Sequence, residues 1–164
     1  EGVAAITQAD NRWQRRDIKT TALLANVLLR QAAAQAGAEE AILLRDGQAL
    51  EGAASNLFIV LDNTVVTPAL SHELLHGVTR DLVLTLSKKQ GWATTEGPIS
   101  EADLRRADEI WLSSSTRELI PVTQLDQTPV GQSQPGPVWQ QVYQAFQEQK
   151  AVIRQQGSPA INGS

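Results

Sequence analysis

A lysine stands where two contrasting stretches of the sequence meet. Lys19 ends the mixed polar segment "RRDIK", and the apolar run "ALLANVLLRQAAAQAG" begins three residues later, at Ala22. Burial lowers the pKa of a lysine, and a neutral amine can attack a carbonyl carbon to form a Schiff base. The alternative is a structural lysine whose stem packs on apolar groups while its ammonium stays in water.

A carboxylate next to a run of small residues is the second candidate. Glu51 precedes Gly52-Ala53-Ala54-Ser55, and the apolar segment "NLFIV" follows. Small side chains let a flat ligand approach the backbone closely. A carboxylate at such a place can hold a pyridinium nitrogen protonated, which makes pyridoxal phosphate an electron sink.

A helix start supplies the third candidate, an anion site. Gly77 releases the chain into a predicted helix whose first amides belong to Val78 and Thr79, and such amides bind phosphate. The segment "SSST" at 113–116 adds hydroxyl donors. An amine, a carboxylate for a ring nitrogen and an anion cradle are the parts that a pyridoxal phosphate site requires.

Other chemistries fit the sequence less well. His72 and His76 lie in "HELLH", which matches a zinc motif, and Glu96 follows at a distance suited to a third ligand. Gly77 should end any helix there, however, so we expect surface histidines and no metal. The serines at 113–115 lack a G-x-S-x-G elbow, and no glycine-rich nucleotide loop is present.

The elements that position these groups mix strands and helices, with hairpins more frequent than β-α-β units. Turn residues Asp46-Gly47 and Asp62-Asn63 predict two β-hairpins. Apolar periodicity predicts a helix at 22–35, with an apolar face at Leu23, Val27, Leu28 and the Ala-rich turns that follow. The remaining elements are strands at 2–7, 12–19, 109–114 and 120–125, a turn at 69–77, and helices at 78–90, from Ser100, and from Pro137. We therefore expect an α+β (mixed α/β) domain over 1–150, with a flexible tail at 151–164.

Composition excludes several classes of function. The chain has 164 residues, a net charge of −4 and no cysteine, so disulfide and thiolate chemistry are excluded. An acidic pI near 5.2 argues against nucleic-acid binding. No apolar run is long enough for a membrane span. We expect a cytoplasmic protein.

Taken together, these segments resemble the class IV (fold type IV) pyridoxal-phosphate aminotransferases, among them the D-amino acid aminotransferases. The resemblance rests on "RWQRRDIKTTALLANVL", "EAILLRDGQALEGAASNLF", "LHGVTRD" and "SSSTRELIPV", and it covers almost the whole chain.

The resemblance implies a role for each matching residue. Lys19 corresponds to the lysine that forms the Schiff base with pyridoxal 5′-phosphate and carries the proton, and Glu51 to the partner of the pyridine nitrogen. The residues that it implies at the rest of the cofactor site are Ser55, Asn56, Leu75 on the ring face, and Val78, Thr79, Ser114 and Ser115 around the phosphate. One departure is Ala53-Ala54, where relatives often carry serines.

The resemblance also implies a larger enzyme. Family members have an N-terminal domain ahead of this segment, and no methionine opens this chain. We therefore expect the C-terminal large domain of a homodimeric enzyme that transfers an amino group from an amino acid, such as D-alanine, to a 2-oxo acid. By itself this fragment should have little or no activity. The alternatives are an aminodeoxychorismate lyase, a branched-chain aminotransferase and a non-catalytic domain.

Overall fold

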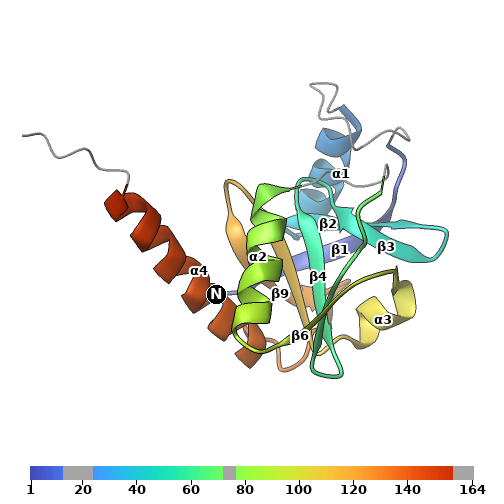
Figure 1. Ribbon diagram of the computed structural model, residues 1–164. Helices are drawn as coiled ribbons and strands as arrows, with labels where there is room; N and C mark the ends of the chain where they lie inside the picture. Colours follow the sequence, from blue (N-terminus) through green and yellow to red (C-terminus); the bar gives the residue numbers. More distant parts are fainter. Residues whose placement is uncertain (13–23, 72–76, 157–164) are drawn as a thin grey trace, which may run out of the picture.

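The computed structural model describes residues 1–12, 24–71 and 77–156. Within these ranges the strands form one mixed sheet with helices packed on it (Figure 1). In chain order the elements are β1 (Val3–Ala9), α1 (Leu24–Gln35), β2 (Glu40–Arg45), β3 (Gln48–Gly52), β4 (Asn56–Leu61), β5 (Thr64–Thr67), α2 (Val78–Lys89), β6 (Ala93–Glu96), β7 (Ile99–Ser100), α3 (Glu101–Arg106), β8 (Glu109–Ser114), β9 (Glu118–Leu125), β10 (Thr128–Pro129) and α4 (Pro137–Gln156). This arrangement confirms the expected α+β class.

The sheet curls until its central strands close into a ring. The neighbours run β4-β8-β9-β1-β2-β3, and β3 pairs again with β4. The closing pair is Glu51 with Asn56. Between them the chain turns tightly, with the amide of Gly52 donating to the carbonyl oxygen of Ser55 at 2.7 Å. β5 and β6 extend the sheet beyond β4, and β7 extends it beyond β3.

Alternation along the strands divides the apolar side chains between two cores. Leu57 and Ile59 of β4 and Ile110 of β8 belong to one cluster, to which Leu104 of α3 also contributes. Phe58 and Trp111 point the other way and pack with residues of α2 and α4. α2 and α4 therefore cover one face of these strands, and α3 contributes to the cluster on the other face.

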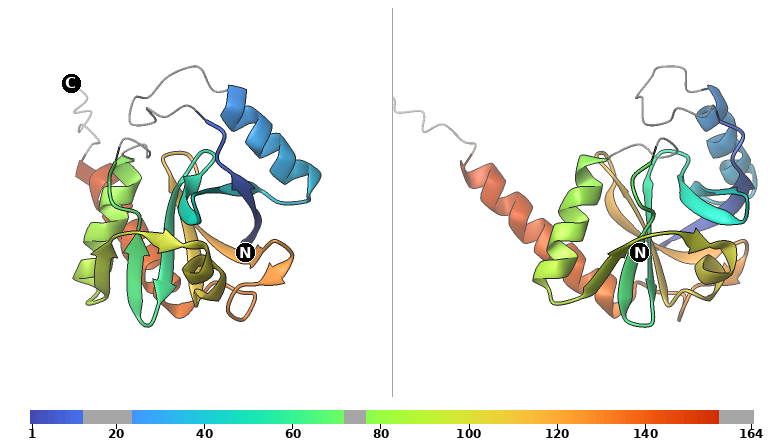
Figure 2. Two further views of the ribbon diagram at one scale, coloured as in Figure 1. Left: turned by 90° about the vertical axis from the view of Figure 1, so that its right-hand side faces the viewer. Right: turned by 45° about the vertical axis from the view of Figure 1, so that its right-hand side comes forward.

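Of the described helices, the three longer ones lie on two sides of the ring, and α3 lies near β7 and β3. α2 and α4 pack against each other on one side, whereas α1 lies on another, near β2 (Figures 1 and 2). The C-terminal half of α4 extends beyond the sheet. No helix in the part of the chain that the structure describes is long and apolar enough to cross a membrane.

Local rules predict two hairpin turns and the start of α3 correctly. Asp46-Gly47 and Asp62-Asn63 join β2 to β3 and β4 to β5, and all four residues have the positive φ that two-residue hairpin turns require. Ser100 caps α3, accepting a hydrogen bond from the amide of Asp103 at 3.0 Å. The predicted strand at 12–19 lies almost entirely outside the described residues.

The predicted apolar face of α1 is wrong at Val27 and Leu28 and correct in the Ala-rich turns, where Ala33 is buried. Val27 and Leu28 are 56% and 52% exposed, whereas Leu29 and Ala33 are buried; Leu23 lies outside the described residues. α1 packs on Ala41 and Ala53, which belong to the same apolar cluster. An Ala-rich helix has more than one row of apolar side chains that could face the sheet. The row with Ala33 has smaller side chains, so it lets the helix lie close to Ala41 and Ala53.

Two further elements differ from expectation. β6 is a short strand parallel to β5, in a segment where we expected no strand. Its sequence, "ATTE", is mostly polar because it is an edge strand with exposed side chains. α4 runs to Gln156, past residue 150, where we placed the end of the folded domain.

A buried carboxylate fixes the start of α4. Glu109 accepts hydrogen bonds from the amides of Val138 at 2.9 Å and Trp139 at 2.8 Å, and from the indole of Trp111 at 2.9 Å. Gly136 allows this approach, because a Cβ there would lie 2.1 Å from Glu109 Cδ. The carboxylate thus satisfies two unpaired amides at a helix start and complements the helix dipole.

We predict that Glu109→Ala lowers the free energy of unfolding by about 2–4 kcal/mol, because two amides and an indole lose their acceptor in a buried place. Chemical denaturation followed by tryptophan fluorescence measures the change. The control is Glu148→Ala on the exposed side of α4, which should change stability by less than about 0.5 kcal/mol. Equal effects of the two substitutions would contradict the capping role.

Candidate functional site

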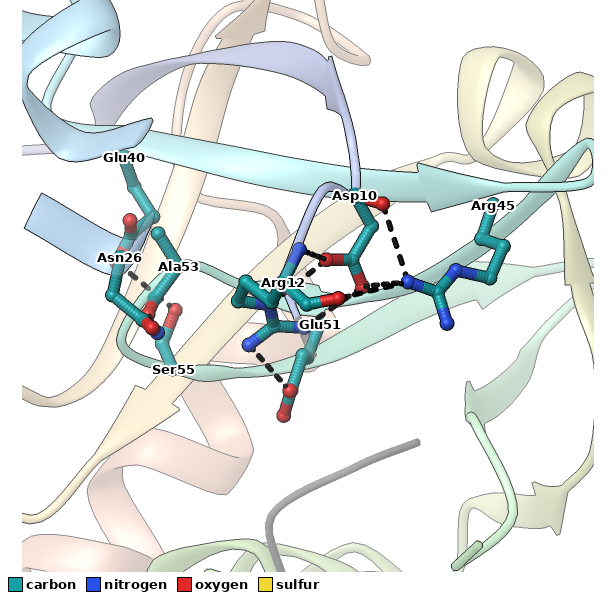
Figure 3. A network of polar contacts seen from close by, with 8 residues as sticks. All are labelled: Asp10, Arg12, Asn26, Glu40, Arg45, Glu51, Ala53 and Ser55. Atoms are coloured by element: carbon teal, nitrogen blue, oxygen red, sulfur yellow. Dashed lines mark hydrogen bonds and ion pairs between the residues drawn. The ribbon is translucent and has the colours of Figure 1, made fainter. Parts of the chain in front are cut away.

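Glu51 is buried at the end of β3 and forms an ion pair with Arg12. Arg12 Nη1 lies 2.9 Å from Glu51 Oε1, and the two side chains are only 7% and 4% exposed (Figure 3). Asp10 holds the same guanidinium, accepting from Nε at 3.0 Å and from Nη2 at 3.1 Å. Arg45 extends the network, since its Nη2 donates to the carbonyl oxygen of Asp10 at 3.2 Å.

The charges in this network stabilise each other. Burial works against the charged guanidinium of Arg12, but hydrogen bonds to Asp10 and the negative charges of Glu51 and Asp10 outweigh it, so the pKa of Arg12 is raised. Arg12 is therefore a permanent buried cation. A fixed cation 2.9 Å away favours the charged form of the Glu51 carboxylate. That is the form that can accept a proton or a hydrogen bond from a ring nitrogen.

A row of buried polar side chains runs from Glu51 across the sheet. Glu51 is in register with Asn56 on β4, and Asn56 is in register with Ser113 on β8. All three are buried. Residues directly opposite each other in an antiparallel pair share a face of the sheet. The hydroxyl of Ser113 has no hydrogen-bond partner among the described residues, which is unusual for a buried polar atom.

The start of α2 meets this row. A Cβ placed on Gly77 would lie 2.2 Å from Asn56 Oδ1, so only glycine allows the backbone so close. Gly77 is the N-cap residue in an extended conformation, and no side chain caps the helix within the described residues. Val78 is 87% exposed. The uncapped amides and the positive end of the helix dipole provide a cradle for an anion.

Ser55 and Ser114 face a different environment. Ser55 donates to Glu40 Oε2 at 3.2 Å, and Ser114 Oγ accepts from the amide of Arg117 at 3.1 Å. Both line a small hollow of about 50 Å³ with mixed polar and apolar walls, to which Arg30, Glu40, Leu112 and Arg117 also contribute. Side chains alternate along β8, so Ser113 and Ser114 point to opposite faces.

Ser115 lies in the exposed turn that joins β8 to β9. This turn follows Ser113 and Ser114, so it lies at the end of the sheet where the buried row crosses β8. The structure thus brings Glu51, Asn56 and the start of α2 together, with Ser115 beyond the end of a neighbouring strand.

Several predicted residues lie outside the described residues, namely Lys19, Leu75, His72 and His76. Glu96, the expected third residue of a hypothetical zinc motif, pairs with Arg80 at 2.7 Å. The described residues hold no group of three potential metal ligands.

Arg12 is a residue that reasoning from the sequence missed. It lies in the matching segment "RWQRRDIK", but nothing local distinguishes it from Arg15 or Arg16. The sequence offers only an indirect indication of this role for Arg12. A carboxylate expected to be buried and charged needs a cation beside it, and an arginine close to the predicted lysine was the natural choice.

Comparison with known proteins identifies the family of this chain. Residues 2–125 match the family model described as "Amino-transferase class IV". The chain belongs to the class IV aminotransferases. Pyridoxal 5′-phosphate is the cofactor of this class.

Two curated relatives are D-alanine aminotransferases. The enzyme of Bacillus licheniformis is 42% identical over 146 residues, which cover 89% of this chain and 52% of the relative. The enzyme of Listeria monocytogenes serotype 1/2a (strain 10403S) is 41% identical over 149 residues, covering 91% and 52%. The chain therefore spans about half the length of these class IV aminotransferases.

Similar solved structures are branched-chain amino acid aminotransferases. The Escherichia coli enzyme is 34% identical with a TM-score of 0.81, covering 88% of this chain and 51% of the other. The T.th. enzyme, complexed with N-(5′-phosphopyridoxyl)-L-glutamate, is 29% identical with a TM-score of 0.82, covering 90% and 52%. These matches confirm the predicted family and the fold type IV architecture.

The described residues fit the cofactor of the class IV aminotransferases. Glu51 is a charged acceptor for a ring nitrogen, and the uncapped start of α2 suits a phosphate. Ser113, a buried hydroxyl without a partner among the described residues, lies in the same polar row.

We predict that Arg12→Met lowers the free energy of unfolding by about 3–5 kcal/mol, because it leaves Asp10 and Glu51 buried without their cation. Arg12→Lys should recover only part of this loss, since one ammonium cannot replace a fork that bonds both carboxylates. Thermal and urea unfolding measure both variants.

The control is Arg105→Met, which removes the pairs that this 44% exposed side chain makes with Glu101 and Asp126. Exposed pairs contribute about 0–1 kcal/mol. If Arg12→Met cost no more than Arg105→Met, Arg12 would not be the charge that supports Glu51.

Proposed function

We propose that the full-length protein uses pyridoxal 5′-phosphate to transfer an amino group from a D-amino acid, such as D-alanine, to a 2-oxo acid. The observation that carries this proposal is the Arg12–Glu51 pair, buried at the edge of the sheet where α2 begins. A charged carboxylate fixed near an anion cradle suits a ligand with a basic ring nitrogen at one end and a phosphate at the other.

When bound, the cofactor supplies an aldehyde carbon for the amino group and a ring that accepts an electron pair. Glu51 keeps the ring nitrogen protonated, because Arg12 holds its carboxylate charged. This favours loss of the α-proton from the amino acid. Lys19, which lies outside the described residues, is the residue to which we assign that proton, at Nζ, on the ground of its match to the family.

The remaining residues of the site bind and orient the cofactor. The amides of Val78 and Thr79 donate to the phosphate, and Ser115 adds a donor from the turn after β8. Asn56 separates Glu51 from the start of α2 and fixes the spacing between them. Leu75 packs on the ring by analogy with the family. Ser55 and Ser114 are proposed as cofactor-site residues on the resemblance to the family alone, because the hollow that both line lies on the other face of β8 from Ser113.

The curated relatives favour the D-alanine reaction, since two of them carry that name at 41–42% identity. The solved branched-chain aminotransferases keep a second substrate class open at 29–34% identity. Aminodeoxychorismate lyase, which uses the same cofactor for β-elimination of pyruvate, is the other alternative in the family. A domain without catalysis is the alternative outside it.

Assembly and location belong to the same proposal. We assign a homodimer and a cytoplasmic location to the full-length protein, on the model of the family. Because the chain spans about half of its relatives, we assign the activity to the full-length protein. We expect little turnover from residues 1–164 by themselves.

The substrate assignment predicts that the full-length protein forms pyruvate from D-alanine only when 2-oxoglutarate is present. L-leucine with 2-oxoglutarate, and aminodeoxychorismate by itself, should react at least about tenfold more slowly, measured as kcat/KM. A preference for L-leucine would identify a branched-chain enzyme. Pyruvate from aminodeoxychorismate alone would identify the lyase.

The residue roles predict different effects of two substitutions. Lys19→Ala should abolish turnover and the absorbance of the Schiff base. Glu51→Gln should lower kcat by roughly 10²-fold, because the ring nitrogen loses its charged partner, while cofactor binding persists. Glu148→Gln, an exposed acid on α4, serves as the control. Full activity of Glu51→Gln would refute the proposed role of Glu51.

A further inference from the structure

Arg80 is a buried charge that the proposed chemistry does not use. It lies in the first turn of α2, three residues after Gly77, and is only 1% exposed. A guanidinium is rarely buried unless its donors are paired, because desolvation of a charge is costly. Its contacts therefore indicate what the buried charge holds in place.

Arg80 joins the start of α2 to the ends of two strands. Its Nη2 donates to the carbonyl oxygen of Pro68 at 2.8 Å and to Glu96 Oε2 at 2.7 Å. Pro68 directly follows β5, and Glu96 ends β6. The two strands are parallel, with Thr67 in register with Glu96, so both partners lie at the same end of the sheet.

The contact with Pro68 also ties the first turn of α2 to the end of β5. Thr67, the last residue of β5, is itself fixed, because its hydroxyl donates to the carbonyl oxygen of Leu57 on β4 at 2.6 Å. The start of α2 is therefore connected to the central sheet through Pro68 and Thr67.

The start of α2 is thus held from two directions. On one side Gly77 abuts the side chain of Asn56, which is in register with Glu51. On the other side Arg80 binds Pro68 and Glu96. These contacts set where the amides of Val78 and Thr79 lie relative to Glu51, and no N-cap side chain in the described residues shares that task.

We propose that Arg80, paired with Glu96, is a positioning residue that holds the start of α2 so that its amides meet the phosphate of the cofactor. This inference rests on the proposed function. Hydrogen bonds weaken steeply when distance or angle departs from the optimum. A small rotation of the first turn should therefore weaken binding of the phosphate and leave the ring contacts of Glu51 unchanged.

The test compares two ligands that differ only in the phosphate, pyridoxal 5′-phosphate and pyridoxal. The full-length protein is freed of cofactor, and both dissociation constants are measured by absorbance. Glu96→Gln removes the nearer of the two charge partners of Arg80 and leaves Asp81, whose Oδ1 lies 3.5 Å from Nη1. The Glu96 side chain is 42% exposed, so the protein should fold. Arg80→Lys keeps the charge and loses the fork.

We expect both variants to bind pyridoxal 5′-phosphate about tenfold more weakly, which corresponds to the loss of one well-formed hydrogen bond to a charged group. The dissociation constant for pyridoxal should stay within about twofold of the value for the unmodified protein. The matched control is Glu101→Gln, which removes the exposed pair with Arg105 at the same 2.7 Å separation. It should change neither constant.

Three results would overturn the inference. An unchanged preference for the phosphorylated ligand in Glu96→Gln and Arg80→Lys means that Arg80 does not position the phosphate site. An equal loss for both ligands means that Arg80 only stabilises the fold. If the unmodified protein binds both ligands equally, the phosphate site itself is absent, and the cofactor assignment fails together with the inference.

Discussion

The candidate site depends on one buried ion pair. A carboxylate enclosed by protein keeps its charge only when a cation is fixed beside it, and Arg12 lies 2.9 Å from Glu51 for that purpose. Asp10 in turn orients Arg12 with two hydrogen bonds, and Arg45 binds the backbone of Asp10. Glu51 is therefore supported by a network that spans the ends of β1, β2 and β3. Without this network, burial would favour a neutral carboxyl group at the same place.

The sequence contains enough local information for much of this fold. The turns at Asp46-Gly47 and Asp62-Asn63, the cap at Ser100 and the helix start after Gly77 follow from backbone preferences that act within a few residues. Glu51 is recognisable because a carboxylate before a run of small residues is a local pattern. The family resemblance joins these parts into one cofactor site.

Features that depend on residues far apart in the chain cannot be predicted from such local patterns. The choice between the two apolar stripes of α1 depends on Ala41 and Ala53, which come later in the chain. Arg12 and Arg80 look like other arginines until the fold places Glu51 beside one and Pro68 with Glu96 beside the other. The same holds for β6, whose polar sequence forms a strand because β5 offers it a free edge.

The closure of the ring between β3 and β4 has a consequence for stability. This junction consists of a single register pair, Glu51 with Asn56, whereas β4 and β8 are paired over five positions. The ring therefore has its shortest strand pairing at the place where the cofactor would bind. A ligand that contacts both Glu51 on β3 and the amides of α2 would connect the two sides of this junction. Its binding would raise the free energy of unfolding in proportion to the logarithm of the ligand concentration. Binding of the cofactor and the stability of the ring of strands are thus coupled.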